Sequence, residues 1–274
     1  MNFSVLMSVY NNEDSVYFEQ SLKSIMHQTL KPTEVVLVKD GPLNPSLNQI
    51  IEQFKTKINL VIVSLKKNHG LSYALNIGLQ HCNYDFVARF DTDDILIKNR
   101  FEKQINYIKQ HPSVDILGGY AITIDDNNVR KSILKVPISH KEIRKKIWIC
   151  PFIHPTVMFR RDFILEVGGY NPDSGHRQDD YDLWFRCYEK NANFANLDVP
   201  LIYYRFTNDN IKRNDLKTGL ARFKVGSKYI KRLKLSKIAY IGLLIPIIVG
   251  VLPSPINIYF YKTTRIFKKV LNIL

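Results

Sequence analysis

The stretch Phe86-Val87-Ala88-Arg89-Phe90-Asp91-Thr92-Asp93-Asp94 decides how this 274-residue chain is interpreted, because an apolar run ends there in several carboxylates. The run predicts a buried strand, and the acids follow at its end. Carboxylates held this close repel one another unless a cation neutralises them. Such oxygen ligands suit Mg²⁺ or Mn²⁺, which take further ligands from water and substrate phosphates. The stretch therefore favours a nucleoside-diphosphate substrate. The alternative is a solvated acidic turn, since Asp is common in turns.

Strands alternate with helices through the first 110 residues. Buried strands are predicted at 5–10, 35–38, 60–63 and 85–90, and helices at 16–28, 71–80 and 100–110. This alternation predicts an α/β fold with a mostly parallel sheet flanked by helices. Ligands of such sheets bind at the carboxyl ends of the strands. We therefore expect the polar strand ends at 10–12, 40–41 and 91–94 to converge on one crevice.

The second half is less regular. Strand-like segments are predicted at 116–117 and 121–124, followed by a turn at 125–128. The acidic segment from Gln178 to Trp184 opens a predicted helix whose apolar residues face inward. Acids at a helix start also suit the helix dipole, so this segment has a purely structural explanation as well.

Charge is distributed unevenly along the chain. The formal net charge is +14, but residues 201–274 contain 15 Lys and Arg against only Asp209 and Asp215, which leaves residues 1–200 at +1. The basicity belongs to the C-terminal segment and not to the predicted catalytic body, so we do not expect a nucleic-acid partner.

The cysteines and the N-terminus argue for a reducing compartment. The 3 cysteines are far apart and odd in number, which indicates neither a disulfide framework nor a structural zinc site. The apolar start is short, lacks a basic leader and runs into Asn11-Asn12. It is therefore predicted to be a strand and not a secretion signal.

Short motifs follow one another in a characteristic order. They are Ser8-Val9-Tyr10-Asn11, Ser24 to Thr29, Lys39-Asp40-Gly41, Asn68 to Ser72, Asn76-Ile77-Gly78, Asp91 to Asp93 and Asp179 to Trp184. Together they resemble a family 2 glycosyltransferase with the GT-A nucleotide-sugar fold, over about Phe3 to Tyr204. The resemblance is strongest to bacterial enzymes that make surface polysaccharides such as O-antigen, capsule or exopolysaccharide.

The resemblance implies three parts and a donor pocket. Residues 1–110 would bind the nucleotide sugar, 111–205 the acceptor, and 206–274 would form a helical, membrane-associating appendage. By matching position, Asp40 resembles the residue that binds the base, usually uracil, with Ser8 and Tyr10 in the same pocket and Asn76 on the donor side. Lys39 stands where the family commonly has an acid, and this departure bears on the identity of the nucleotide.

The resemblance also implies roles for the two acidic groups. Asp91 would contact the ribose or sugar side and the metal, Asp93 would ligate the Mn²⁺ or Mg²⁺ that bridges the diphosphate, and Asp94 would support the loop. Asp180 matches the base that takes the proton of the acceptor hydroxyl, and Asp179 replaces the Glu usual before it. Base and leaving group would lie on opposite faces of the sugar, which implies a single displacement with inversion.

Two residues have open alternatives on the acceptor side. Trp184 is a candidate for stacking on a sugar ring, but an aromatic at helical spacing also suits the core. His154 matches a position near the acceptor, and a structural histidine is the alternative.

The C-terminal segment predicts attachment to a membrane. Residues 238–261 carry no formal charge, and basic residues flank them on both sides. The length would allow a spanning helix, but three prolines and the positive flanks favour a re-entrant or interfacial segment at the cytoplasmic face. The alternative is a helical cap packed on the protein or on a second subunit. Attachment at the inner face of the cell membrane suggests a lipid-linked saccharide acceptor.

Two other classes of function compete with this interpretation. A membrane- or nucleic-acid-binding module would use the basic tail and be indifferent to Asp93→Asn. A nucleotidyltransferase also uses carboxylates, a metal and an α/β sheet, but the first strand is followed by Tyr10-Asn11-Asn12 and not by a Gly-rich basic loop.

Overall fold

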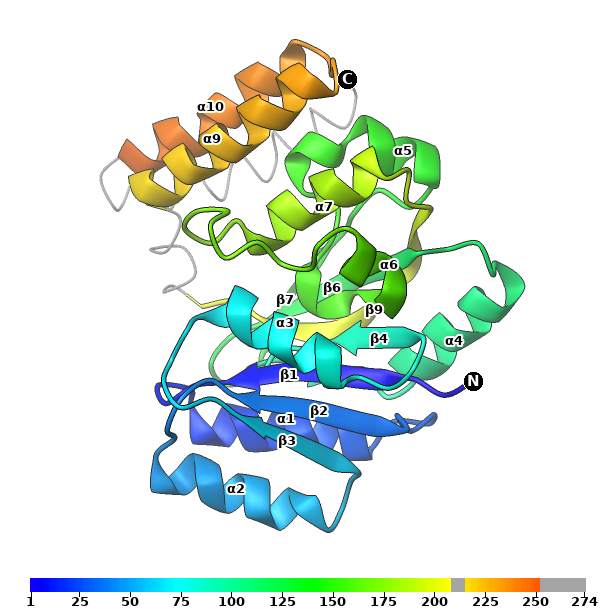
Figure 1. The fold of residues 1–274 in the computed structure, drawn as a ribbon, viewed down its shortest axis with the longest axis vertical. Coiled ribbons are helices and arrows are strands. Elements are labelled where there is room, and N and C mark those ends of the chain that lie inside the picture. Colours follow the sequence, from blue (N-terminus) through cyan, green and yellow to red (C-terminus); the bar gives the residue numbers. More distant parts are fainter. Residues whose placement is uncertain (208–214, 252–274) are drawn as a thin grey trace.

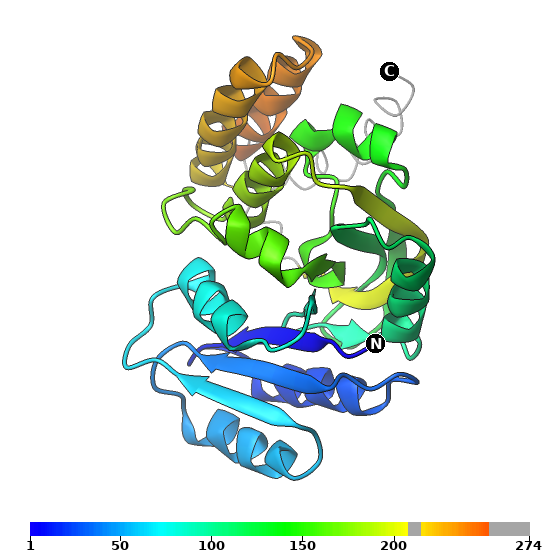
Figure 2. The same cartoon turned by 45° about the vertical axis from the view of Figure 1, so that its right-hand side comes forward.

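A computed structural model describes residues 1–207 and 215–251 (Figure 1). Within these residues, one sheet of 9 strands runs through the molecule in the order β3-β2-β1-β4-β8-β6-β9-β5, with β7 paired to β6. Helices cover both faces, so the predicted α/β class is confirmed (Figure 2).

The N-terminal half of the sheet is parallel. It contains β1 (Ser4–Val9), β2 (Glu34–Lys39), β3 (Leu60–Ser64) and β4 (Phe86–Arg89), which pair in parallel as β3-β2-β1-β4. The central strands β1 and β2 are buried almost throughout, which explains why they are continuous apolar runs. All four strands were predicted within one or two residues.

Two hydrophobic cores lie on the two faces of this sheet. On one face pack α1 (Ser15–Met26), α2 (Pro45–Lys55) and α4 (Arg100–Gln110). On the other face lies α3 (Leu71–His81), whose core continues into the C-terminal helices. Helix α2 was not predicted, although Asn44 caps it and Pro45 occupies its first turn, which is a usual helix start.

The C-terminal half of the sheet is mixed. Its strands are β5 (Ile95–Leu96), β6 (Ile116–Ile124), β7 (Arg130–Leu134), β8 (Met158–Arg160) and β9 (Phe194–Arg205). Strand β8 lies antiparallel between β4 and β6, whereas β9 runs parallel to β6.

The two predicted segments around 116–124 are one strand, β6. Gly118 and Gly119 join them because the neighbouring strand comes too close for a side chain. A Cβ at Gly118 would lie 2.3 Å from the side chain of Asn196, and one at Gly119 would lie 2.6 Å from that of Leu201.

The remaining helices gather beyond one face of the sheet. They are α5 (His140–Lys145), α6 (Arg161–Glu166) and α7 (Asp179–Glu189), with the short 3₁₀ turns η1 (Ile147–Ile149) and η2 (His154–Thr156). Helix α7 begins at the acidic pair predicted to open a helix, and its Leu183, Trp184 and Cys187 are buried.

The C-terminal appendage is a helical hairpin. Helices α9 (Leu216–Arg232) and α10 (Ile238–Val251) lie side by side above α7 (Figures 1 and 2). They approach closely at Gly219 and Gly226, where a Cβ would come within 2.8 Å of the Pro246 carbonyl oxygen and 2.7 Å of the Leu243 side chain.

The described part of the predicted membrane segment is thus packed on the protein along one side. Residues 252–261 of that segment lie outside the described residues. In the part of the chain that the structure describes, no helix combines the length and apolarity needed to cross a bilayer.

Candidate active site

The acidic loop after β4 brings three carboxylates together. Oxygen atoms of Asp91, Asp93 and Asp94 lie within 4.8 Å of one another. Asp94 is fully buried, and its Oδ1 accepts a hydrogen bond from the Arg205 backbone N–H at 2.8 Å. Its Oδ2 has no hydrogen-bond partner among the described residues.

These carboxylates fit a divalent cation. Burial and the neighbouring Asp91 raise the pKa of Asp93 to about 6, and burial with Asp93 raises the pKa of Asp94 well above its usual range. Both groups are therefore disfavoured as anions unless positive charge is added. An all-oxygen donor set with one buried oxygen unpartnered suits Mg²⁺ or Mn²⁺.

One buried arginine, Arg89, stands at the end of β4 directly before this loop. Its guanidinium forms an ion pair with Asp91, while its Nε has no hydrogen-bond partner among the described residues. Burial lowers the pKa of Arg89, but the charge of Asp91 more than offsets this, so the pKa is raised overall. From the sequence, Arg89 was predicted only as part of an apolar strand. A charged residue inside such a run could have indicated a site residue.

A second arginine, Arg205 at the end of β9, clamps the loop from the other side. It donates to the carbonyl oxygens of Asp93 and Asp125, both at 2.9 Å, and to Asn128 Oδ1 at 2.8 Å. Its guanidinium lies 3.7 Å from the centre of the Tyr17 ring. Arg205 was also missed, because nothing in the sequence near 205 points to residues so far away along the chain.

The second acidic group opens α7. Asp180 Oδ1 accepts a hydrogen bond from the Tyr181 backbone N–H at 2.7 Å, and Cys150 Sγ lies 3.6 Å from Oδ2. Burial, and then the charge of Asp179, raise the pKa of Asp180 to about 6. A carboxyl group with this pKa is mostly ionised at neutral pH and still basic enough to accept a proton.

The two acidic groups face the same space. Burial raises the pKa of Asp179, Asp91 raises it further, and Arg89 lowers it, so all three charges interact. Arg89 also lowers the pKa of Asp93. The buried Arg89 guanidinium therefore interacts with the acids of the loop after β4 and with Asp179, the residue directly before Asp180.

The predicted base-binding residues lie at the ends of β1 and β2. Asp40 follows β2, and its backbone N–H donates to the Val9 carbonyl at 2.8 Å, beside the exposed Tyr10 and the half-buried Ser8. The carboxylate of Asp40 accepts the backbone N–H groups of His69 at 2.7 Å and Gly70 at 2.9 Å. Asp40 thus shapes the loop that precedes α3.

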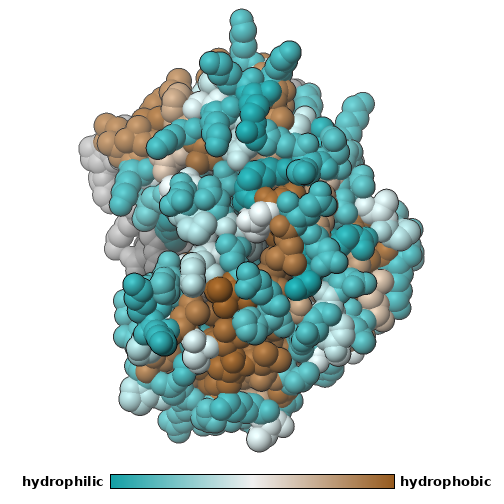
Figure 3. Space-filling view, viewed as in Figure 1, coloured by the Kyte–Doolittle hydropathy of each residue, from teal (hydrophilic) through white to brown (hydrophobic). Residues whose placement is uncertain are grey.

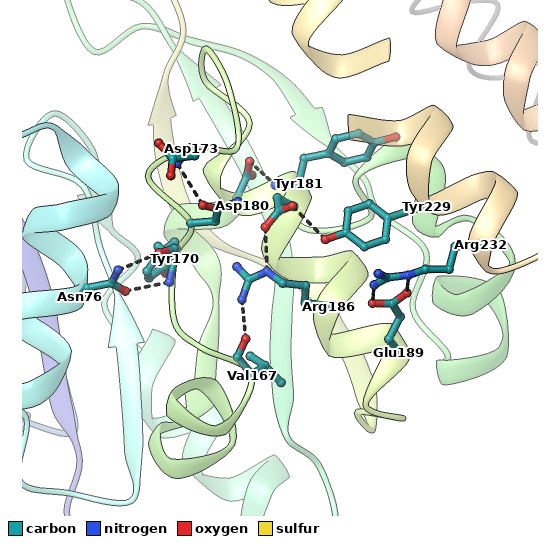
Figure 4. Close-up of polar contacts among 12 residues, drawn as sticks. Asn76, Val167, Tyr170, Asp173, Asp180, Tyr181, Arg186, Glu189, Tyr229 and Arg232 are labelled. Atoms are coloured by element: carbon teal, nitrogen blue, oxygen red, sulfur yellow. Dashed lines mark hydrogen bonds and ion pairs between the residues drawn. The ribbon is translucent and has the colours of Figure 1, made fainter. Parts of the chain in front are cut away.

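Asn76 on α3 is bound to the segment before α7. Its side-chain amide donates to the Tyr170 carbonyl and accepts from the Tyr170 N–H, both at 2.7 Å (Figure 4). Gly169 allows this approach, since a Cβ there would lie 2.4 Å from Asn76 Oδ1. Asn76 therefore links the first half of the fold to the loop that leads to Asp179.

The two candidate acceptor residues are placed differently. His154 Nε2 lies 2.9 Å from the Tyr170 hydroxyl, and burial lowers the pKa of His154 well below its usual range, so its ring is neutral. Trp184 is 0 % exposed and packs against Phe152 and His154. The structure thus places Trp184 in the core, which is the second of its two predicted roles.

Comparison with known proteins decides the family. The sequence profile described as "Glycosyl transferase family 2" matches residues 4–168. The chain belongs to glycosyltransferase family 2.

Two relatives of this glycosyltransferase are bacterial proteins with named activities or pathways. It is 40% identical to the "Amylovoran biosynthesis glycosyltransferase AmsE" of Erwinia amylovora, over 77% of this chain and 79% of that protein. It is 32% identical to the "UDP-Gal:alpha-D-GlcNAc-diphosphoundecaprenol beta-1,3-galactosyltransferase" of Escherichia coli, over 95% of both chains.

Solved structures share the fold of this glycosyltransferase. S. aureus TarS 1–349 in complex with UDP-GlcNAc matches with a TM-score of 0.62 at 20% identity, over 92% of this chain and 82% of that one. The mannosyltransferase PcManGT from Pyrobaculum calidifontis, in complex with GDP-Man and Mn²⁺, matches with a TM-score of 0.62 at 16% identity, over 93% of this chain and 71% of that one. The predicted GT-A fold is confirmed.

Membership of this family shows that the protein is an enzyme that transfers sugars. It favours that activity over the nucleotidyltransferase and the binding module considered from the sequence. The roles of individual site residues and the division at 110 and 205 stay predictions.

Proposed function

We propose that this enzyme is an inverting glycosyltransferase that moves a sugar from a UDP-sugar to a hydroxyl group of a lipid-linked saccharide, in the synthesis of a surface polysaccharide. The observation that carries the proposal is the meeting of two acidic groups around Arg89, one suited to a metal and one to accepting a proton.

Asp91 and Asp93 would hold the metal at the donor side. A bound Mn²⁺ or Mg²⁺ would supply Lewis-acid neutralisation of the charge that develops on the departing diphosphate. Arg205 fixes the loop through the Asp93 carbonyl, and Asp94 fixes it through the Arg205 N–H, so the two ligands are pre-positioned. Arg89 is a second positive charge beside the same acids.

Asp180 would remove the proton from the attacking hydroxyl. Its Oδ1 is oriented by the Tyr181 N–H, while the donor that the described residues offer to Oδ2 is the weak Cys150 thiol. Because base and diphosphate would act from opposite sides of the sugar, the hydroxyl would displace the nucleotide in one step and invert the anomeric carbon. The buried Asp179 would keep the Asp180 carboxylate basic through repulsion.

A uridine nucleotide is favoured as donor. Asp40 and the loop it anchors, with Ser8 and Tyr10, would form the base pocket. Lys39, the departure from the usual acid, points to α2, where its Nζ donates to Asn48 Oδ1 at 2.7 Å. The name of the Escherichia coli relative includes UDP-Gal, and TarS has been solved with UDP-GlcNAc.

The acceptor and the membrane attachment rest on the C-terminal hairpin and on the relatives. One face of α10 exposes a row of apolar residues at helical spacing, namely Ile238, Ile241, Leu244, Ile248 and Val251. Figure 3 shows an apolar surface where Figure 1 places this helix. With the basic residues of α9 nearby, this face would rest on anionic lipid at the inner side of the cell membrane. The Escherichia coli relative is named for a diphosphoundecaprenol-linked acceptor.

A panel of nucleotide sugars tests the proposal. The full chain is incubated with each nucleotide sugar and Mn²⁺, and thermal stabilisation and slow hydrolysis of the donor are measured. At least one UDP-sugar is expected to stabilise the protein and to be hydrolysed, and both effects are expected to disappear with EDTA. Stabilisation by none of the UDP-sugars would refute the assignment of the donor.

A further inference from the structure

A pocket of about 330 Å³ lies between α9 and the loop that leads to the candidate base. Its volume is within the range of small-molecule sites, roughly 300–1,000 Å³. The loop side contributes residues 171 and 173–176, and the helix side contributes Lys217, Ala221, Lys224, Val225 and Lys228. Neither the predicted active-site acids nor the comparisons account for this pocket.

The helix wall of the pocket is positively charged. Lys217, Lys224 and Lys228 are exposed and share one face of α9, and none forms an ion pair with a carboxylate of the described residues. Of the acids that line the pocket, Asp182 is already paired with Arg186 at 2.7 Å. Among the described residues that line the pocket, Asp173 is the other acid, against three lysines, and His176 lines the loop side.

The loop wall contains a buried hydroxyl without a partner. Ser174 is only 6% exposed, and its Oγ has no hydrogen-bond partner among the described residues. Burying a hydroxyl in this way costs free energy unless a ligand completes the hydrogen bond. A donor hydroxyl in a pocket that three lysines also line suits an acceptor-rich anion such as a phosphate group.

The pocket adjoins the candidate base. The loop continues directly into Asp179, and Asp182 on α7 lines the pocket. Arg222, on a neighbouring face of α9, lies 4.6 Å from the centre of the Tyr181 ring. The exposed apolar face of α10 lies on the helix packed against α9. The packed helices α10, α9 and α7 therefore offer an apolar face, a cationic pocket wall and the candidate base in turn, which is the order of lipid, diphosphate and sugar in a lipid-linked saccharide.

From this arrangement we propose that the pocket between residues 171–176 and α9 binds the diphosphate of a lipid-diphosphate-linked acceptor, with the three lysines and Ser174 as ligands. The proposal rests on the proposed function, since it specifies the acceptor of the same reaction. Membrane phospholipids offer the same phosphate chemistry, so the test must separate the two sources.

Binding of decyl diphosphate to the full chain, without donor or metal, is the direct test. The Lys224→Gln/Lys228→Gln variant is compared with Lys231→Gln/Lys237→Gln, which removes the same charge from exposed lysines outside the pocket. Calorimetry is expected to show binding at least about tenfold weaker for the pocket pair and unchanged for the control pair. Lys224→Arg/Lys228→Arg is expected to retain binding.

Ser174→Ala gives an independent measurement. Since the hydroxyl is unpartnered, the variant is expected to melt at or above the temperature of the wild type while binding decyl diphosphate more weakly. A variant that binds normally would remove Ser174 from the site.

Vesicles of phosphatidylglycerol distinguish a headgroup site from an acceptor site. Both pairs of Lys→Gln substitutions are expected to reduce vesicle binding equally, because each pair removes the same charge.

Two results would overturn the proposal: no binding of decyl diphosphate by the wild type, or equally weakened binding of decyl diphosphate in the two pairs of variants. Stabilisation by a UDP-sugar is measured in parallel and is expected to be unchanged in the pocket pair. If no UDP-sugar stabilises the wild type, this would contradict the proposed function but not the binding of diphosphate in the pocket.

Discussion

At the scale of single residues, Asp93 and Asp180 have similarly raised pKa values but are suited to different tasks. Each is raised to about 6, first by burial and then by a neighbouring acid, which is Asp91 for the first and Asp179 for the second. Asp93 belongs to a group of three acids that a divalent cation would relieve. Asp180 stands in the first turn of α7, where Asp179 is the acid that raises its pKa, and a proton from the acceptor would relieve this repulsion.

Replacing Asp180 by Asn is expected to abolish transfer and to stabilise the fold. The pKa of this acid is about 6 in the folded state against roughly 3.9 when unfolded, so the folded state binds the proton more tightly. Stability of the wild type is therefore lost as the pH rises from about 4 to 6. Asn removes this penalty. The free energy of unfolding of the variant should therefore exceed that of the wild type by an amount that grows over this pH range, to on the order of 1–3 kcal/mol at pH 7.5.

Urea unfolding of both proteins at several pH values measures this difference. If the free energy of unfolding of the variant depends on pH as that of the wild type does, Asp180 is not the acid whose raised pKa lowers stability above pH 4. Full transfer activity in Asp180→Asn would remove it as the base. UDP-sugar binding is expected to persist in the variant.

Replacing Asp93 by Asn is expected to weaken metal binding. The change removes one charged ligand from the carboxylate group, so activation by Mn²⁺ should require roughly 100-fold more metal. Activity is titrated with Mn²⁺, and Asp162→Asn serves as a control because its side chain is 82% exposed and lies outside the site. Equal metal requirements in the two variants would exclude Asp93 as a ligand.

At the scale of elements, α7 connects the candidate base to the C-terminal hairpin. Phe185 and Tyr229 stack with ring centres 4.6 Å apart, and the Tyr229 hydroxyl donates to Asp182 Oδ1 at 2.9 Å. Glu189 and Arg232 form an ion pair one turn farther along each helix (Figure 4). Helix α9 is thus fixed on the same helix that begins with Asp179 and Asp180.

Replacing Tyr229 by Phe tests this connection. The variant keeps the stacked ring but leaves a buried carboxylate oxygen of Asp182 without its donor, which is expected to cost about 1–3 kcal/mol. Urea unfolding measures the loss. Tyr240→Phe is the matched control, since the contact of the Tyr240 hydroxyl within the described residues is a long one of 3.5 Å to the Ser227 carbonyl oxygen. The control should change stability by less than about 0.5 kcal/mol. Similar losses in the two variants would contradict the role of the Asp182 hydrogen bond.

The elements that sequence reasoning located are those with an unambiguous pattern. Strands β1, β2 and β4 are continuous apolar runs because both faces are buried, and α4 was predicted with its observed bounds. Strand β9 was missed because it contains Pro200, which is tolerated where the β6–β9 register shifts. Among site residues the acids were located, whereas Arg89 and Arg205 were not, because burial of an arginine depends on partners distant in sequence.

At the scale of the whole molecule, the hairpin of α9 and α10 would place the active site at a membrane. Helix α10 packs on α9 along one side and exposes apolar residues along another, including Ile241 at 65% and Ile248 at 54%. Removing residues 236–274 should release the protein from the membrane, but the deletion would also remove Leu243, which packs against Gly226 of α9.

Point substitutions on the exposed face avoid that complication. Ile241→Glu/Ile248→Glu is expected to lower the partition to anionic vesicles by roughly tenfold or more, because apolar burial is lost and like charge is added. Val129→Glu/Ile133→Glu is the control, since these residues are exposed on the β6–β7 hairpin at 51% and 53%. Sedimentation with vesicles measures both. If the α10 pair sediments like the wild type, this face does not contact lipid.

The central claim is that Asp180 and a metal held by Asp91 and Asp93 act from opposite sides of one sugar. The most direct measurement is the anomeric configuration of the product, read by proton NMR from the coupling of the anomeric proton. A donor with an α-linked sugar is expected to give a β-linked product in the presence of Mn²⁺. A product that keeps the α configuration of the donor would contradict the account.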